Sequence, residues 1–238
     1  MKFDEPTLQV RNLHKTFVLH PQGGVRLPVF AGVSLAVRAG ECVALDGPSG
    51  CGKSTLIRCL FGRYVCDAGE ILLRHRDGRI DLANASAREI LEARRETIGY
   101  VSQFLHVVPR VSTLELVAEP LLQRGIEPEP AYERARELLL RLGLPSNLWS
   151  LAPATFSGGE QQRVNIAAGL IDRKPILLMD EPTASLDAGN AQTVLELIRT
   201  TCAAGSSVVV ILHDAAQRRI VCDREIHLPA PLERAAIG

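Results

Sequence analysis

The chain has 238 residues, and the apolar fraction of 46% is enough to bury the core of one large domain or of two closely packed lobes. Its 27 basic and 27 acidic residues give a formal net charge of zero, which argues against nucleic acid or anionic lipid as the main partner. Aromatic residues make up only 4%, which argues against a platform for stacking bases.

The start of the chain and its cysteines indicate the compartment. Residues 1–6 are charged and contain no apolar stretch of the kind that a signal peptide needs. No apolar run approaches the length that spans a bilayer, so a membrane part would have to come from another chain. The six cysteines form no C-x-x-C pair and no zinc-like spacing. We therefore expect a protein of the reducing cytoplasm.

Residues 8–37 are expected to form short strands joined by turns. Thr16–Leu19 and Val25–Phe30 flank Pro21–Gly24, a sequence typical of a hairpin turn. This pattern predicts an antiparallel β-subdomain at the N-terminus that could hold a nucleotide base. Phe17 is a candidate to stack on adenine, and the alternative is an ordinary core phenylalanine.

The stretch Gly47–Thr55 fits the pattern G-x-x-x-x-G-K-[ST] and stands between an apolar run at 42–45 and a helix-like segment at 56–61. Its glycines allow the backbone to turn several N–H groups toward one anion, and the helix adds its positive end. We expect Lys53 to reach the β- and γ-phosphates of a nucleotide and Ser54 to supply a hydroxyl to Mg²⁺. The nucleotide-binding residues predicted here are Gly47, Pro48, Ser49, Gly50, Cys51, Gly52, Lys53, Ser54 and Thr55.

Three elements are expected between this loop and residue 103. Residues 71–82 predict a second hairpin, and 87–95 have the composition of a helix. Residues 98–102 predict a buried strand that ends at Gln103.

The character of the chain then changes from strands to helices. Apolar residues recur at helical spacing across 112–142, where Pro128 and Pro130 are expected to separate two helices. We interpret residues from about 104 to 172 as a helical subdomain inserted in an α/β core. No internal repeat or low-complexity linker divides the chain, so we expect a single domain over residues 1–238.

A further helix start stands at Ser157, which is a good N-cap residue. Glu160 follows three positions later, as in a capping box, so a helix should begin here. The other elements expected in the last third are a helix at 191–198 and a strand at 224–228.

Two more buried strands end on polar residues. Residues 175–179 are a continuous apolar run that ends on Asp180 and Glu181, and residues 207–212 end on His213. Ligands of open α/β sheets bind at the carboxyl ends of the strands. The phosphate loop and the polar residues at these strand ends can therefore converge on one phosphate chain.

The polar residues at the strand ends fit the needs of Mg-ATP hydrolysis. Mg²⁺ prefers oxygen ligands, and the candidates are Ser54, a water held by Asp180, and Gln103. Glu181 is expected to point to the opposite side of an extended strand from Asp180, where it can orient and polarise the attacking water. His213 could donate to the γ-phosphate. The alternatives are a solvated acidic turn for the carboxylate pair and a structural role for the histidine.

The motifs resemble, in order and spacing, those of the ABC ATPase superfamily. The matching segments are Gly47–Ser54 (Walker A), Gln103 (Q-loop), Ser157–Gln161 (signature), Ile176–Asp180 with Glu181 (Walker B and base), Ser185–Asp187 (D-loop), His213 (switch histidine) and Phe17 (aromatic A-loop position). The resemblance implies an α/β fold of the ABC ATPase type, with a P-loop NTPase core, the N-terminal antiparallel β-subdomain and a helical signature subdomain.

The same resemblance implies a head-to-tail dimer, of two identical chains or with a related ATPase. Ser157 and Gly159 of one subunit would contact the γ-phosphate bound by the Walker A loop of the other. The nucleotide contacts carried over on this basis are Ser157, Gly158, Gly159, Glu160 and Asp187.

Less specific flanking segments resemble the L subunit family of the bacterial phosphonate carbon–phosphorus lyase system. They are Thr16–His20 with Gly23–Pro28, Val101–Leu105 with Val108–Arg110, and Leu148–Pro153 before Phe156. By resemblance, this chain would be an ATPase without a transporter, associated with soluble lyase subunits. It would be linked to the formation of ribose 1-alkylphosphonate 5-triphosphate from ATP and a phosphonate.

Two other functions compete with this interpretation. The first is the ATP-binding subunit of a membrane exporter of the lipoprotein-releasing or macrolide-export kind, whose partner is a membrane permease. The second is a mechanical ATPase in DNA repair or translation, which single-domain length and zero net charge argue against. The surface around 103–122 discriminates, because in transporters it receives a coupling helix. Here Phe104–Arg110 is apolar and basic, which suits either kind of partner.

Two positions depart from the family pattern. Ala168 stands where these ATPases commonly carry arginine, so any contact of that arginine is missing; the alternatives are a more weakly bound partner and altered coupling. Asp46 places an anion just before the phosphate loop. We expect it to face outward, with a modest weakening of nucleotide binding as the alternative.

Overall fold

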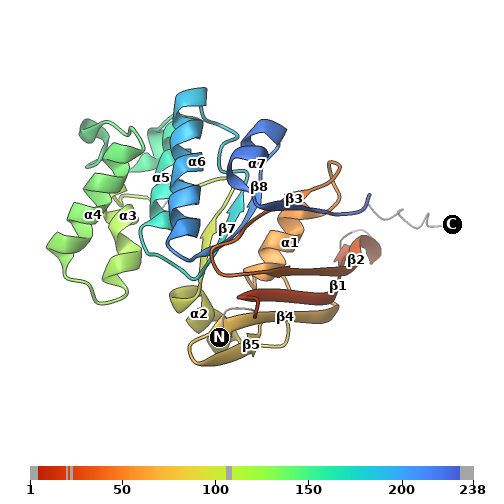
Figure 1. Cartoon of the computed structure of the whole chain (residues 1–238). Helices are drawn as coiled ribbons and strands as arrows, with labels where there is room; N and C mark the ends of the chain where they lie inside the picture. Colours follow the sequence, from red (N-terminus) through yellow and green to blue (C-terminus); the bar gives the residue numbers. More distant parts are fainter. Residues whose placement is uncertain (1–4, 20, 22–23, 106–108, 231–238) are drawn as a thin grey trace.

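The computed structural model describes residues 5–19, 21, 24–105 and 109–230 (Figure 1). Residues 22–23 of the predicted turn at Pro21–Gly24 lie outside these ranges. The same holds for residues 106–108 of the predicted partner segment Phe104–Arg110.

An antiparallel sheet forms the N-terminal part, as predicted. Its strands are β1 (Leu8–Leu19), β2 (Val25–Val37), β4 (Ala68–His75) and β5 (Gly78–Asp81), in the order β2-β1-β4-β5. Both predicted hairpin pairings occur, with Phe17 opposite Leu27 and Leu73 opposite Ile80. The short strands expected before residue 38 are two long ones instead. Register shifts between Val10 and Thr16 let β1 and β2 bend without ending.

A parallel sheet forms the second layer. Its strands are β3 (Cys42–Asp46), β6 (Ile98–Val101), β7 (Ile176–Asp180), β8 (Ser207–Ile211) and β9 (Arg224–His227), in the order β6-β7-β8-β3-β9. Every residue of β7 and β8 is buried, which explains their continuous apolar sequences. The parallel arrangement places the carboxyl ends of β3, β6, β7 and β8 at one edge, where the phosphate loop begins.

Helices cover both faces of the parallel sheet. They are α1 (Lys53–Leu60), α2 (Ala87–Glu96), α3 (Thr113–Leu122), α4 (Pro128–Arg141), α5 (Gly158–Leu170), α6 (Ala188–Ala203) and α7 (Ala215–Val221), with short 3-10 turns at Ser146–Leu148 and Pro153–Thr155. Helix α1 lies between the two sheets, where Leu56 and Ile57 share one core with Leu8 and Val43 (Figure 1). Helices α5 and α6 share a second core with the other face of the sheet.

The structure corrects one detail of the helical region. Pro128 and Pro130 do not separate the two helices; Pro128 is the first residue of α4 and Pro130 lies in its first turn. Proline is tolerated there because first-turn N–H groups have no partner within the helix. Helices α3, α4 and α5 pack against one another. The limits of the helical subdomain, about 104–172, stay a prediction.

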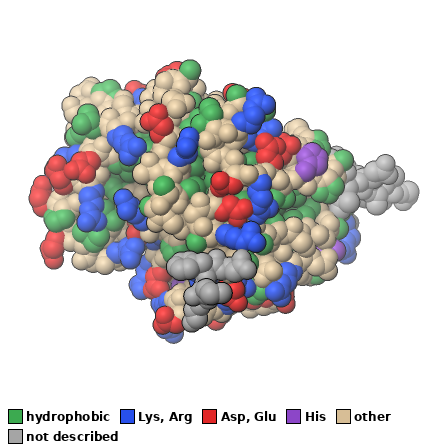
Figure 2. Space-filling view, viewed as in Figure 1, with side chains coloured by type: hydrophobic (Ala, Val, Ile, Leu, Met, Phe, Trp, Pro, Cys, Tyr) green, Lys and Arg blue, Asp and Glu red, His purple; other side chains and the backbone are tan. Residues whose placement is uncertain are grey.

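The surface agrees with a chain of zero net charge. Acidic and basic side chains are interspersed over much of the face shown in Figure 2. In the part of the chain that the structure describes, no helix is both long and apolar enough to cross a bilayer.

Candidate functional site

The phosphate loop is held closely by the strands around it. Gly47 has φ +141° and Gly52 has φ +96°, values that other residues rarely adopt. A Cβ atom on Gly47 would lie 2.7 Å from the Leu228 carbonyl oxygen, and one on Gly52 would lie 2.6 Å from Val29 Cγ1. The loop therefore depends on these two glycines for its shape and for its packing against β2 and the end of β9.

Helix α1 presents its N-terminus to the same place. Its N-cap residue is Gly52, so no side chain caps the helix, and its first turn contains no acidic residue. The positive end of the helix dipole is thus left for an anion. Lys53 Nζ donates to the carbonyl oxygens of Gly47 (2.7 Å) and Pro48 (3.1 Å), which holds the ammonium group at the loop. These features support an anion such as a phosphate chain.

Asp180 and Ser54 meet where β7 ends. Ser54 Oγ donates to Asp180 Oδ1 at 2.8 Å. Asp180 is fully buried, and its Oδ2 has no hydrogen-bond partner among the described residues; Arg58 comes only within 4.0 Å. A hydroxyl and a carboxylate with a free oxygen are the hard donors that Mg²⁺ takes. The residues present therefore fit the predicted metal.

Burial of the ionised Asp180 carboxylate lowers the stability of the folded chain. Desolvation raises the pKa of Asp180, although the Ser54 hydroxyl and Arg58 oppose the rise. The folded chain therefore holds this proton more tightly than the unfolded chain, and the ionised carboxylate lowers stability at neutral pH. As pH falls through the raised pKa, protonation removes this cost.

Asp180→Asn should consequently stabilise the protein while removing activity. The amide keeps the shape and can accept the Ser54 hydrogen bond without a charge. Without nucleotide and Mg²⁺ at pH 7.5, we expect the Tm to rise by about 2–4 °C, which corresponds to roughly 1 kcal/mol for a chain of this size. The gain should shrink toward about pH 4. Thermal unfolding of both proteins between pH 4 and pH 7.5 measures this gain. A Tm of Asp180→Asn below that of the wild type at pH 7.5 would contradict a destabilising Asp180 carboxylate.

The structure corrects the predicted direction of Glu181. The strand ends at Asp180, and Glu181 has φ +53°, so it is not the next residue of an extended strand. Its carboxylate instead lies between Gln103, whose Nε2 donates to Oε2 at 3.1 Å, and His213, whose Nε2 lies 2.6 Å from Oε1. Three side chains predicted from the ends of β6, β7 and β8 are thus brought together. The role of Gln103 as a metal ligand stays a prediction.

The signature segment begins helix α5 as predicted. Ser157 is the N-cap, and its side chain forms a full capping box with Glu160. Ser157 and Gly158 are exposed. A Cβ on Gly158 would meet nothing within 4 Å, whereas one on Gly159 would lie 3.0 Å from the Ser185 carbonyl oxygen. Gly158 is therefore not required by the packing of this chain.

Two buried polar residues of α5 were missed by the sequence analysis. Gln162 Nε2 donates to the Pro182 carbonyl at 3.2 Å, and Asn165 Nδ2 donates to the Ser102 carbonyl at 2.5 Å. They attach the signature helix to the segments that carry Glu181 and Gln103. The available signal was their three-residue spacing on a helix face that is otherwise apolar.

Phe17 and Asp187, two predicted nucleotide contacts, both have partners within the chain. Phe17 is half-buried, and the Tyr64 ring packs edge-on against it with 5.2 Å between the ring centroids. Lys15 Nζ lies 4.6 Å from the centroid of the Phe17 ring. Asp187 is the N-cap of α6, where it accepts from the Asn190 N–H at 2.9 Å. Their contacts with nucleotide stay predictions.

Asp46 does not simply face outward. Its Oδ2 lies 3.2 Å from His227 Nδ1, and its Oδ1 lies 3.6 Å from the Arg218 guanidinium. Desolvation acts against ionisation, but the Gly47 N–H, His227 and Arg218 together hold the pKa of Asp46 below its ordinary value. The negative charge beside the phosphate loop is thus balanced by partners.

The chain is similar to known proteins over most of its length. Residues 30–184 match the family described as ABC transporter. The chain is 38% identical over 225 residues to the lipoprotein-releasing system ATP-binding protein LolD of Ruegeria sp. (strain TM1040), covering 94% of this chain and 96% of the relative. It is 40% identical over 225 residues to LolD 2 of Caulobacter vibrioides, with coverage of 94% and 95%.

Two further similarities extend these matches. The chain is 36% identical over 211 residues to the macrolide export ATP-binding/permease protein MacB of Pasteurella multocida, which covers 89% of this chain and 31% of that protein. The dimeric structure of MJ0796, a bacterial ABC transporter cassette, superposes with a TM-score of 0.84 at 30% identity and covers 93% of this chain and 94% of the other. The chain therefore belongs to the ABC transporter family, as an ATP-binding cassette.

Proposed function

We propose that this chain is the ATP-hydrolysing subunit of a membrane exporter of the lipoprotein-releasing or macrolide-export kind. The observation that carries the proposal is 38% identity over nearly the whole length of both chains to a protein named for lipoprotein release. None of the names of the relatives given above mentions phosphonate metabolism. The phosphonate-lyase interpretation rests on short flanking segments alone, so the comparisons favour the exporter.

In this proposal the phosphate loop and Lys53 bind the phosphates of ATP. Ser54 and Asp180 would hold Mg²⁺, which would supply positive charge beside the phosphates. Water attacks the γ-phosphorus, the bond to the β-phosphate oxygen breaks, and ADP and phosphate leave. Glu181 accepts the proton that the water loses.

The neighbours of Glu181 suit this role. Gln103 and His213 each contact a different carboxylate oxygen, at 3.1 Å and 2.6 Å, which fixes the plane of the carboxylate. A base held in one orientation needs no rearrangement when the water attacks the γ-phosphorus. His213 is two-thirds exposed, so it can also contact the γ-phosphate.

We infer that two copies close over the nucleotide, head to tail. Ser157 and Gly158 are exposed at a capped helix start, and the packing of their own chain does not require Gly158 to be glycine. An exposed helix N-terminus fits a phosphate supplied by another subunit. The similarity to a dimeric cassette structure supports this arrangement.

A groove between the core and the helical region is the proposed docking place for the permease. A cavity of about 280 Å³ lies beside Ser102, Leu105 and Leu116. A second cavity, of about 260 Å³, shares Ala168 and two other lining residues with it. Phe104, next to this groove in the chain, is 71% exposed. A groove lined by both apolar and polar residues, with an exposed aromatic residue beside it, fits an amphipathic helix of a membrane partner.

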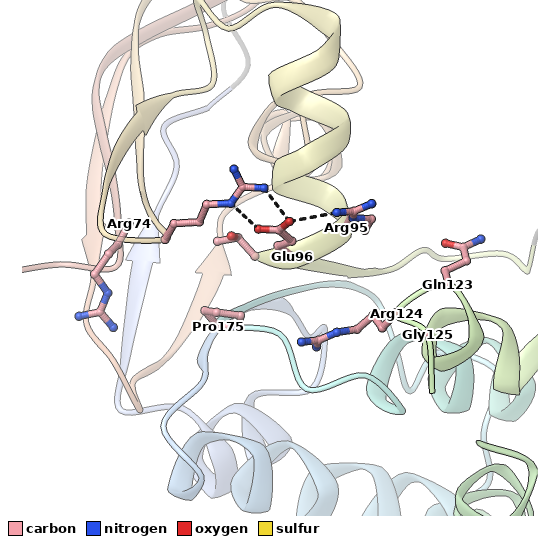
Figure 3. A pocket seen from close by; sticks show the side chains of 9 residues that line it. Arg74, Arg95, Glu96, Gln123, Arg124, Gly125 and Pro175 are labelled. Carbon is pink, nitrogen blue, oxygen red and sulfur yellow. Dashed lines mark hydrogen bonds and ion pairs between the residues drawn. The ribbon is translucent and has the colours of Figure 1, made fainter. Parts of the chain in front are cut away.

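The groove continues into a larger, basic cavity of about 760 Å³. In Figure 3, Arg124 extends into this cavity from the end of α3, below Arg95 and Glu96 at the end of α2. Arg74 and Arg76 also line it. Its surplus of arginine fits a permease segment with acidic residues beyond the docked helix. The proposal places the chain on the cytoplasmic side of the membrane.

Co-purification tests this function. The tagged Glu181→Gln chain, isolated from a detergent-treated whole-cell lysate of its own host, should retain an integral membrane protein with several spanning helices. Ala168→Trp, which fills the groove, should release that protein. Ala203→Trp, at an exposed helix end elsewhere, should not. Recovery of soluble phosphonate-lyase subunits instead would replace the exporter with the phosphonate interpretation.

A further inference from the structure

We propose that Arg218 is a positioning residue for ATP hydrolysis, which holds the main chain of His213 against the start of the phosphate loop. The inference rests on the proposed ATPase function. Arg218 lies on helix α7, directly after the switch histidine, and its side chain is only 12% exposed. The sequence predicts no element between His213 and Arg224, so this arginine follows no sequence pattern.

All three nitrogens of the guanidinium group have partners. Nη1 donates to the carbonyl oxygens of Leu212 (2.8 Å) and His213 (3.1 Å). Nε donates to Glu225 Oε1 at 3.0 Å, and Nη2 lies 3.6 Å from Asp46 Oδ1. Five donors in one rigid plane allow arginine to hold several acceptors at fixed distances from one another.

These partners belong to three neighbouring strands of the site. Leu212 and His213 follow β8, Asp46 is the last residue of β3 and precedes Gly47, and Glu225 is in β9. Strand β3 lies between β8 and β9 in the sheet. The guanidinium therefore joins the end of the strand that carries the phosphate loop to the end of the strand that carries the switch histidine.

The position of the His213 side chain depends on the hydrogen bond from Arg218 to the His213 carbonyl oxygen. This side chain is 66% exposed, and its one side-chain partner among the described residues is Glu181, at 2.6 Å. Its place is thus set by its main chain, whose carbonyl oxygen Arg218 binds. The adjacent Gln217 attaches the same helix to the segment after Glu181, by a contact of 2.7 Å with Thr183 Oγ1. Helix α7 thus contacts the main chain of His213 and the segment that follows Glu181.

Loss of Arg218 should affect turnover more than nucleotide binding. The phosphate loop keeps its glycines and Lys53, so ATP should bind with a Kd within about threefold of wild type. The histidine and Glu181 would lose their fixed relation to the loop. A shift of about 1 Å in such a group costs on the order of 100-fold in rate, so we expect kcat to fall by about 10- to 100-fold.

The test compares Arg218→Gln with Arg219→Gln, since Arg219 is the adjacent, exposed arginine of the same helix. Steady-state hydrolysis gives kcat and KM, titration with a fluorescent ATP analogue gives Kd, and assays run below the Tm of each variant. Arg218→Gln should lose kcat at nearly constant Kd, Arg218→Lys should be intermediate, and Arg219→Gln should match wild type.

Asp46→Asn combined with Arg218→Gln should have a kcat no lower than Arg218→Gln alone, because both changes break one network.

Each outcome decides the proposal. Arg218→Gln with wild-type kcat overturns it, and so does a loss of kcat matched by an equal loss of ATP affinity. If Arg218→Gln does not fold, Arg218→Lys decides: a kcat at least threefold below wild type at unchanged Kd supports the proposal, and a wild-type kcat overturns it. Absence of hydrolysis in the wild-type chain with its membrane partner would instead contradict the ATPase function itself.

Discussion

Replacing Glu181 by glutamine should slow ATP hydrolysis by about 100-fold or more and leave ATP bound. The amide cannot accept the proton of the attacking water, so the chemical step loses its base. The carboxamide can still contact Gln103 and His213, which now hold the carboxylate at 3.1 Å and 2.6 Å, so the site should keep its shape. Phosphate release under single-turnover conditions, beside an ATP-binding titration, measures both parts.

The matched control for this substitution is Glu137→Gln. Glu137 is exposed on α4, away from the strand ends that carry the site. The Glu137→Gln variant should hydrolyse ATP at the wild-type rate. Unchanged turnover in Glu181→Gln would remove Glu181 as the base and leave the contacts with Gln103 and His213 as structural ones.

Gly158→Asp should reduce hydrolysis at least as strongly, and for a different reason. Within one chain the new side chain fits, because a Cβ at this position meets nothing within 4 Å. An acidic residue in the first turn also favours a helix, so the Tm should not fall. In the closed dimer, however, the carboxylate would face the γ-phosphate of the other subunit. We expect at least about a 100-fold loss of kcat with ATP binding to the separate chains retained.

Helix α2 supplies a closely matched control. It begins with the same kind of capping box, formed by Ser86 and Glu89, and Ala87 occupies the position that Gly158 has in α5. Ala87→Asp should therefore leave both stability and hydrolysis unchanged. Wild-type hydrolysis in Gly158→Asp would show that this helix start does not face the nucleotide of a second copy.

The parts of the site that were predictable are those with a local physical signal. Buried parallel strands are continuous apolar runs, so the polar residues after Val101, Met179 and Leu212 marked their ends. The capping box at Ser157 follows from a three-residue spacing, and the structure confirms it. The order of the motifs along the chain then predicted the fold class.

The parts that were missed depend on contacts without a local signal. The left-handed conformation of Glu181 is rare for glutamate, so an extended strand was the reasonable expectation and was wrong. Asp46 pairs with Arg218 and His227, which lie far away in the sequence, so its partners could not be anticipated. Pro128 and Pro130 do not separate the two helices but start the second, because proline is also typical of a helix start.

The partner was also predicted less well than the chemistry. Short flanking segments favoured a phosphonate-lyase subunit, whereas 38–40% identity over 94% of the chain favours an exporter ATPase. Segments of a few residues on strands and turns carry little information about a partner. The groove that would receive this partner combines residues of β6, α3 and α5, which no single segment of the sequence reveals.

The central claim is that each active site is shared between two copies, and mixed dimers test it most directly. Lys53→Ala and Gly158→Asp, each inactive alone, are co-expressed with different tags and isolated as a mixed pair. One of its two sites then combines an intact Lys53 with an intact Gly158. The account predicts recovery of up to about half the wild-type rate of hydrolysis, because one site of two is complete. A mixed dimer as inactive as either variant alone would contradict a shared site.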